Sequence, residues 1–189
     1  MNFPETAPEV HPLIQNRRST RAYSSKPVSE ESIFRMLEAA RWAASSTNEQ
    51  PWRFLIAQKE NPDLYQLVFD ALNPSNQIWV QEAPLLIAVF AKTHFSRNNA
   101  VNFHAWHDVG LAVAQLTLQA TSEGIFVHQL GGFKAEILKT NLNFSDELQA
   151  VTVLAIGYPG DLDMISPELQ ERELKPRMRK SIEEIVLNR

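Results

Sequence analysis

The chain of 189 residues contains no cysteine, which excludes disulfide frameworks, thiolate nucleophiles and cysteine-bound metals. It also lacks a long apolar run, because the longest, residues 85–91, falls far short of the roughly 20 residues that a membrane-spanning helix needs. No secretory signal is visible in residues 1–10, and the absence of cysteine is compatible with the cytoplasm, so we expect a cytoplasmic protein without a membrane partner. The formal net charge of −4 argues against nucleic acid as a partner.

Several motifs that define familiar enzyme classes are also missing. There is no glycine-rich run of a P-loop or a classical dinucleotide site, and no Gly-x-Ser-x-Gly element of a hydrolase. His104 and His107 fall on one face of a predicted helix and could contribute to a metal site. Such a site needs three or more ligands held by a second shell, and the sequence supplies no convincing set, so we expect neither a metal centre nor a hydrolytic triad.

The apolar pattern predicts a single layered domain of the α+β or α/β class. Ser29 and the two glutamates after it begin a helix that should end in the region 43–47, and Pro62 occupies the first position of another. A short strand is expected at 53–57, and continuous apolar runs at 85–91 and 151–157 are typical of strands covered on both faces. The longest helix should span 104–123 and be buried nearly all round, as a central element or a dimer interface.

Two basic segments suggest an anion site. Arg17, Arg18 and Arg21 concentrate positive charge in a chain that is acidic overall, and guanidinium groups suit phosphate because they donate bidentate, charge-assisted hydrogen bonds. The alternative, from spacing alone, is a solvated helix end. A second basic run, which includes Arg177 and Arg179, is by itself typical of a solvated surface.

Two further segments have the chemistry of a ligand site. The small hydroxyls and the amide of residues 45–48, followed by Trp52, can line a polar ligand that carries a ring, although Ser and Asn also favour ordinary turns. Gly131 and Gly132 follow a strand-like segment and allow the backbone to approach a flat ligand closely. A pair of glycines is also common in turns, so this segment alone decides nothing.

The pairing of Arg17-Arg18-Ser19-Thr20-Arg21 with Ser45-Ser46-Thr47-Asn48-Glu49-Gln50-Pro51-Trp52 resembles the FMN-dependent nitroreductase family. The resemblance extends along nearly the whole chain, but Ala44 and Ser181 stand where the family usually has proline. It implies an α+β fold of three layers, with a central, mostly antiparallel sheet flanked by helices. Residues 1–189 would form a single FMN-binding domain, and a C-terminal extension from about residue 158 to 189 would pack on the partner subunit of an interlocked homodimer.

The resemblance also assigns cofactor contacts. The implied cofactor-binding residues are Arg17, Arg18, Ser19, Arg21, Ser45, Ser46, Asn48, Asn76, Gln129, Leu130, Gly131, Gly132, Arg177 and Arg179. The phosphate side would be surrounded by Arg17, Arg18, Arg177 and Arg179, whereas Ser19 and Arg21 would lie toward the flavin ring. Arg21 would occupy the N1/O2 edge, where a cation stabilises a reduced flavin. The serines and Asn48 would contact the flavin of the other subunit. Residues 129–132 would present backbone N–H groups to N5, and Asn76 would contact the ring or, alternatively, occupy a turn.

The expected activity is an FMN-dependent oxidoreductase with a ping-pong mechanism. NADH or NADPH would reduce the flavin, and a nitroaromatic, a quinone or a similar electron-poor acceptor would reoxidise it. Because the cofactor carries the chemistry, no catalytic side chain is predicted. Three alternatives stay open: reduction of enals, enones or halogenated aromatics, a flavin carrier or redox sensor without turnover, and an anion-binding protein without flavin.

Overall fold

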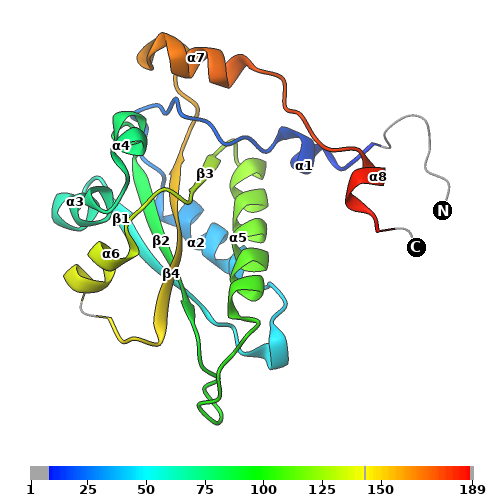
Figure 1. The fold of residues 1–189 in the computed structure, drawn as a ribbon. Coiled ribbons are helices and arrows are strands. Elements are labelled where there is room, and N and C mark those ends of the chain that lie inside the picture. Colours follow the sequence, from blue (N-terminus) through cyan, green and yellow to red (C-terminus); the bar gives the residue numbers. More distant parts are fainter. Residues whose placement is uncertain (1–8, 143, 188–189) are drawn as a thin grey trace.

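The computed structural model of the chain describes residues 9–142 and 144–187 (Figure 1). Its centre is an antiparallel sheet of four strands in the order β1-β2-β4-β3. The strands are β1 (Trp52–Gln58), β2 (Leu85–Lys92), β3 (Phe126–Leu130) and β4 (Leu148–Gly157). The expected α+β fold with an antiparallel central sheet is therefore confirmed.

Strand β2 shows how the three layers form. Its residues alternate between the two faces, as a strand requires: Leu85, Ile87 and Val89 join one core, and Leu86 and Ala88 join the other. The first core lies under α2 (Glu30–Arg41) and α5 (Ala105–Ser122), and the second under α3 (Pro62–Asp70), α4 (Pro74–Val80) and α6 (Ala135–Leu142). Figure 1 shows the two groups of helices on opposite sides of the sheet.

The predicted helix starts are confirmed. The Ser29 side chain accepts a hydrogen bond from the backbone N–H of Ser32 (3.1 Å), and Asn61 caps α3 with Pro62 as its first residue. Helix α2, however, ends at Arg41, before the expected region 43–47. The chain becomes extended at Ser45, which precedes the short 3-10 helix η1 (Ser46–Asn48).

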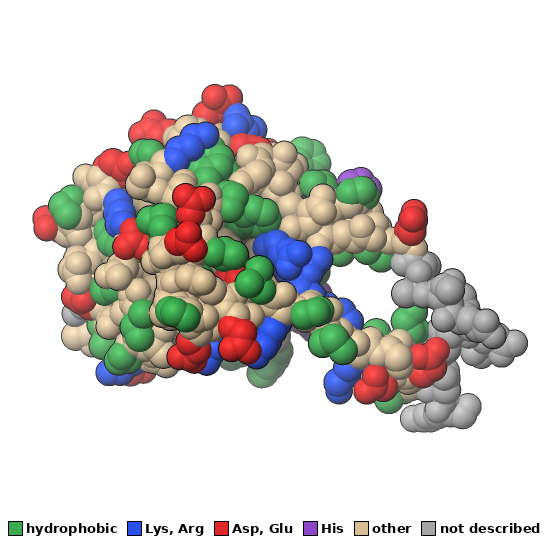
Figure 2. Space-filling model, turned by 90° about the horizontal axis from the view of Figure 1, so that it is seen from above, with side chains coloured by type: hydrophobic (Ala, Val, Ile, Leu, Met, Phe, Trp, Pro, Cys, Tyr) green, Lys and Arg blue, Asp and Glu red, His purple; other side chains and the backbone are tan. Residues whose placement is uncertain are grey.

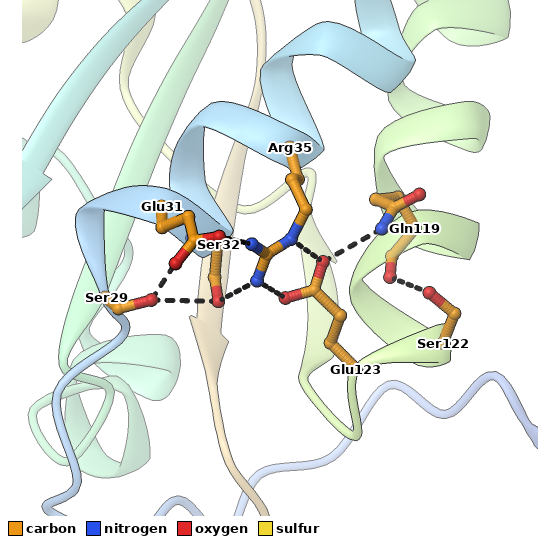
Figure 3. Close-up of polar contacts among 7 residues, drawn as sticks. All are labelled: Ser29, Glu31, Ser32, Arg35, Gln119, Ser122 and Glu123. Atoms are coloured by element: carbon orange, nitrogen blue, oxygen red, sulfur yellow. Dashed lines mark hydrogen bonds and ion pairs between the residues drawn. The ribbon is translucent and has the colours of Figure 1, made fainter.

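A polar clamp joins α2 to the C-terminal end of α5 (Figure 3). Arg35 donates from Nε and Nη2 to the two carboxylate oxygens of Glu123, at 2.8 and 2.7 Å, and Gln119 donates to the same carboxylate at 2.8 Å. The hydrogen bonds from Arg35 lower the pKa of Glu123 to about 2. Glu123 is the C-cap of α5, so this pair fixes the point from which the chain turns into β3.

The prediction that the longest helix is buried nearly all round is wrong for the single chain. The face of α5 that carries Val109, Val113 and Leu116 packs against α2 and the sheet, but Trp106 and Leu111 on the opposite face are exposed. Apolar residues on several sides of a helix show that it needs a partner on each side, but not whether that partner belongs to the same chain.

Helix α1 (Pro12–Asn16) and the C-terminal segment form two arms that project from the same side of the body (Figure 1). After β4, the 3-10 helix η2 (Leu162–Met164) and α7 (Pro167–Leu174) stay on the body, because Ile165 and Leu169 are buried in the second core. From Lys175 the chain runs outward to α8 (Ile182–Ile185). The predicted extension thus divides into an inner part that packs on its own chain and an outer part that projects from the body. Across the described ranges, 9–142 and 144–187, none of the helices combines the length and apolarity of a membrane span.

Candidate functional site

Six predicted site residues line one cavity of about 300 Å³ at the base of the two arms. The cavity is lined by Arg17, Arg18, Ser19, Arg21, His128, Arg172, Glu173, Lys175, Arg177 and Arg179. We call Arg17, Arg18, Arg21, Arg177 and Arg179 the arginine cluster. Figure 2 shows basic side chains gathered where the two arms leave the body. The structure therefore brings together two sequence segments that the spacing alone could not connect.

Hydrogen bonds between the arms hold the arginine cluster in place. Arg177 donates from Nη1 to the backbone carbonyl of Arg17 at 2.8 Å and from Nη2 to the carbonyl of Gln15. Arg17 in turn donates to the hydroxyl of Ser19 at 3.0 Å. The C-terminal segment is thus fastened across the end of α1, and its guanidinium groups face the same cavity as those of residues 17–21.

The cluster concentrates positive charge without carboxylates to balance all of it. Burial lowers the pKa of Arg17 first, and the positive charges of Arg177, Arg179 and Arg18 lower it further. Among residues 9–142 and 144–187, no carboxylate forms an ion pair with any of these four arginines. Repulsion between like charges that is relieved by a bound anion is the electrostatic signature of a phosphate site.

Arg21 lies on the side of the cavity that borders the sheet. Its Cζ atom is 5.8 Å from the ring centroid of Trp79, and Trp79 packs against the ring of His128 with centroids 4.6 Å apart. The Nδ1 atom of His128 lies 2.9 Å from the carbonyl oxygen of Thr20. Because a carbonyl only accepts, Nδ1 carries the proton in this contact. Burial lowers the pKa of His128 to about 4, with a further contribution from Arg21, so the ring is neutral at pH 7.

The second segment near the cavity is the end of β3 that follows His128. Gln129 is exposed there, whereas the side chain of Leu130 is buried in the second core. At Gly132 a Cβ atom would lie 2.7 Å from Nδ2 of Asn76, so no side chain fits unless Asn76 moves. Asn76 belongs to α4, not to a turn, and donates to the carbonyl of Gly132 at 3.0 Å. Asn76 and residues 129–132 are therefore brought together, next to the arginine cluster.

The predicted site residues Ser45, Ser46 and Asn48 do not line the arginine cavity. They lie in residues 45–50, which we call the strained loop, because Thr47, Asn48 and Gln50 have φ values of 52°, 57° and 52°. Left-handed backbone is costly for residues other than glycine, above all for a β-branched one, and it persists where surrounding contacts enforce it. Such strain is concentrated at functional sites, which agrees with a binding role for this loop.

Asp108 in the first turn of α5 is one of the contacts that enforce this backbone. Its Oδ2 atom accepts the backbone N–H of Ser46 at 2.9 Å, and its side chain is only 3% exposed. The hydroxyl of Ser45 accepts the N–H of Gln50 at 3.0 Å, which closes the loop on itself. The strained loop therefore sits at the N-terminal end of α5.

One chain does not bring the strained loop to the arginine cluster. The Arg35–Glu123 clamp lies at the C-terminal end of α5, where the chain turns into β3, whereas Asp108 is near the start of the helix. The helical rise of 1.5 Å per residue separates Asp108 from Ser122 by roughly 20 Å. Within one chain, the predicted site residues thus form two separate groups.

Sequence reasoning missed three residues of this region. His128 and Glu173 line the cavity, and Asp108 anchors the strained loop. His128 stood in a segment singled out for its glycines, and Asp108 drew attention only through the neighbouring His107. Glu173 had no signal, because its helix reads as an alternation of charges on a solvated face. No group of three or more potential metal ligands occurs among the residues that the structure describes.

Comparison with known proteins identifies the class. The sequence profile of the nitroreductase family matches residues 14–158, which is most of the chain. This protein belongs to the nitroreductase family. Family membership makes it an oxidoreductase, as the sequence motifs predicted.

Three relatives illustrate the range. The chain is 29% identical over 154 residues to an Archaeoglobus fulgidus protein provisionally named NADH dehydrogenase/NAD(P)H nitroreductase, covering 79% of this chain and 84% of that protein. It is 26% identical over 201 residues to iodotyrosine deiodinase 1 of Rattus norvegicus, covering 88% and 67%. A crystal structure described as an oxidoreductase containing FMN superposes with a TM-score of 0.91 at 29% identity and covers 99% of this chain and 96% of that one.

Proposed function

We propose that this protein is an FMN-dependent oxidoreductase that takes electrons from NADH or NADPH and passes them to a small electron-poor acceptor. The observation that carries the proposal is the arginine cluster, whose guanidinium groups line one cavity and suit a phosphate dianion. Burial and, after it, the neighbouring positive charges lower the pKa of Arg17. The similar solved structure described as containing FMN supports the choice of anion.

The residues beside the cluster fit the rest of such a cofactor. Gly131 has no atom within 4 Å of the position of a Cβ, and Gly132 needs the absence of one, so a flat ring can lie against this backbone. Ser19 adds a hydroxyl beside Arg17, and Gln129 is exposed at the end of β3. The phosphate would therefore lie among Arg17, Arg18, Arg177 and Arg179, and the ring toward Arg21 and residues 129–132.

When bound, FMN supplies hydride and electron transfer, and the chain supplies position and electrostatics. Arg21 provides a fixed positive charge for the edge of the ring that becomes negative on reduction. His128, neutral at pH 7, adds no competing charge behind it. No acidic or basic side chain is required in the transfer, in keeping with a ping-pong scheme in which donor and acceptor use the site in turn.

The proposed active form is a homodimer. The strained loop lies at the far end of α5 from its own arginine cluster, so a partner must contribute Ser45, Ser46 and Asn48 to each flavin. The exposed apolar side chains of Trp42, Trp106 and Leu111 offer a surface on α2 and α5 for that contact. Residues from Lys175 to Leu187 project outward and would pack on the partner.

The acceptor is proposed by class. A nitroaromatic or a quinone agrees with the family, and the similarity to a protein named iodotyrosine deiodinase 1 favours halogenated aromatics as a second class. A flavin carrier or redox sensor without turnover uses the same site but needs no acceptor pocket. These candidates differ in their kinetics and not in their cofactor.

The decisive experiment is the absorption spectrum of the purified protein, before and after anaerobic addition of NADH or NADPH. We expect flavin bands that bleach rapidly and return when a nitroaromatic, a quinone or an iodinated phenol is added. Bands that persist with either donor would favour the carrier or sensor. A colourless protein that FMN cannot reconstitute would refute the flavin site.

A further inference from the structure

Glu173 contributes the only carboxylate among the described residues that line the arginine cavity. Its Oε1 atom accepts a hydrogen bond from Nη1 of Arg21 at 3.0 Å. The two side chains are 14% and 26% exposed, and the two residues are 152 positions apart in the sequence. The contact is thus a partly buried tertiary ion pair, and not a local pair along a helix.

The other carboxylates of α7 behave differently. Glu168 and Glu171 pair with Arg172 and Lys175 at i,i+4 spacing, and these carboxylate side chains are 73% and 71% exposed. Exposed pairs of this kind contribute little. Ile165 and Leu169 are buried and hold the start of α7 against the body, which brings Glu173 to Arg21.

Arg21 is therefore held from two sides. Glu173 binds one amino group of the guanidinium, and the ring of Trp79, which is 3% exposed, lies 5.8 Å from Cζ on another side. Trp79 is in turn stacked on Tyr23, with ring centroids 6.4 Å apart. A cation confined in this way has a fixed position, and the adjacent carboxylate offsets part of its charge.

We propose that Glu173 is a positioning residue that lowers the reduction potential of the bound flavin by fixing Arg21 and offsetting its charge. This inference rests on the proposed function. Two-electron reduction with uptake of one proton leaves a negative charge on the flavin ring. A full positive charge at Arg21 favours that state, and the carboxylate of Glu173 reduces the preference. The reduced cofactor is then a stronger donor to acceptors.

The variant Glu173→Gln tests this proposal, because Gln keeps an oxygen that can accept from Arg21 and removes only the charge. The purified dimer, loaded with FMN, is reduced anaerobically by xanthine and xanthine oxidase in the presence of a reference dye. We expect the ratio of affinities for reduced and oxidised FMN to rise about tenfold, which for a two-electron couple is about 30 mV toward positive potential. The dissociation constant of oxidised FMN should fall as well.

Glu171→Gln is the matched control, since it removes the same charge from the same helix without touching Arg21. Glu173→Asp keeps the charge but withdraws the carboxylate, and it should shift the potential in the same direction by less. An unchanged or more negative potential in Glu173→Gln would overturn the proposal, as would an equal shift in Glu171→Gln. If the wild type binds no FMN, the proposed function falls and this inference with it, whereas a yellow wild type with insensitive variants refutes this inference alone.

Discussion

The arginine cluster and the strained loop, at opposite ends of α5, are built by different forces. In the cluster, residues from both arms are brought together although their charges repel. Burial lowers the pKa of Arg17 first, and the charges of Arg177, Arg179 and Arg18 lower it further. In the loop, no charge accumulates, but three residues adopt left-handed backbone under the hold of Asp108 and internal hydrogen bonds. A bound anion would therefore relieve the repulsion in the cluster, whereas the conformational cost of the loop is present in the folded chain itself. Changes at the two ends should accordingly separate ligand affinity from stability.

The largest effect is expected from Arg17→Ala/Arg179→Ala. Each charge-assisted hydrogen bond contributes about 1.5–3 kcal/mol, so FMN affinity should fall roughly 100-fold or more. The melting temperature without FMN should stay the same or rise, because repulsion is relieved. Fluorescence titration and calorimetry measure the two quantities. Arg41→Ala removes an exposed arginine outside the cavity and should change neither by much. A large loss of stability without FMN would show that the cluster is structural.

The next largest effect is the pH dependence of folding stability that arises from His128 beside the arginine cluster. His128 has a folded pKa of about 4, against about 6.5 when unfolded, so between these values only the unfolded chain gains the proton. Stability should therefore fall by about 3 kcal/mol at most as the pH drops from about 6.5 to 4.

His128→Gln should flatten that part of the stability curve, which denaturation at a series of pH values measures. For each protein, the free energy of unfolding at neutral pH serves as the reference. An identical slope between pH 6.5 and 4 in the variant would mean that other groups cause the loss.

At the other end of α5, Asp108→Ala should cost stability as well as ligand affinity. The variant leaves the partly buried N–H of Ser46 without its acceptor, a change that costs about 1–3 kcal/mol. Urea denaturation should show this loss with and without FMN, in contrast to the arginine variants. Asp108→Asn keeps an acceptor oxygen and should lose less. Full stability in Asp108→Ala would show that the loop holds its backbone without help from α5.

The smallest effect is expected from Glu123→Gln, which weakens the clamp between α2 and α5 and touches neither group directly. Since the Arg35–Glu123 pair is partly exposed and screened by solvent, the melting temperature at pH 7 should fall by about 2–4 °C at most. The folded pKa of Glu123 is about 2, so the contribution is present above about pH 4.3 and is lost as pH falls toward 2.

The wild type and Glu123→Gln should therefore converge in acid, and their FMN affinities should be similar at pH 7. A drop in FMN affinity larger than the drop in stability would tie the clamp to the site.

The sequence predicted the elements better than their surroundings. Helix starts are marked by Ser29, Asn61 and Pro62 through local hydrogen bonding and backbone conformation. The apolar run 85–91 predicts a buried strand from its own residues alone. The open face of α5 could not be predicted, because hydrophobicity does not identify the chain that covers it.

The site residues divide in the same way, into those predictable from neighbouring residues and those brought together only by the fold. Arg17, Arg18, Ser19 and Arg21 are neighbours in sequence and could be recognised as a unit. Glu173 could not, because its partner lies 152 residues away and its own helix contains equivalent glutamates that point elsewhere. His128 acquires its role from Thr20 and Trp79, contacts that only the fold creates.

The bond from Arg177 to the carbonyl of Arg17 spans 160 residues, and this has a consequence during synthesis on the ribosome. At about 5–20 residues per second, the ribosome needs roughly 8 to 32 s to reach Arg177 after Arg17 has been made. Until then the nascent chain holds only the part of the arginine cluster that belongs to the N-terminal arm. A product that stops short of the final segment would carry the complete sheet but lack Arg177 and Arg179. Under the proposed function, such a product could not enclose the phosphate of FMN, and the cofactor would load only when translation is nearly finished.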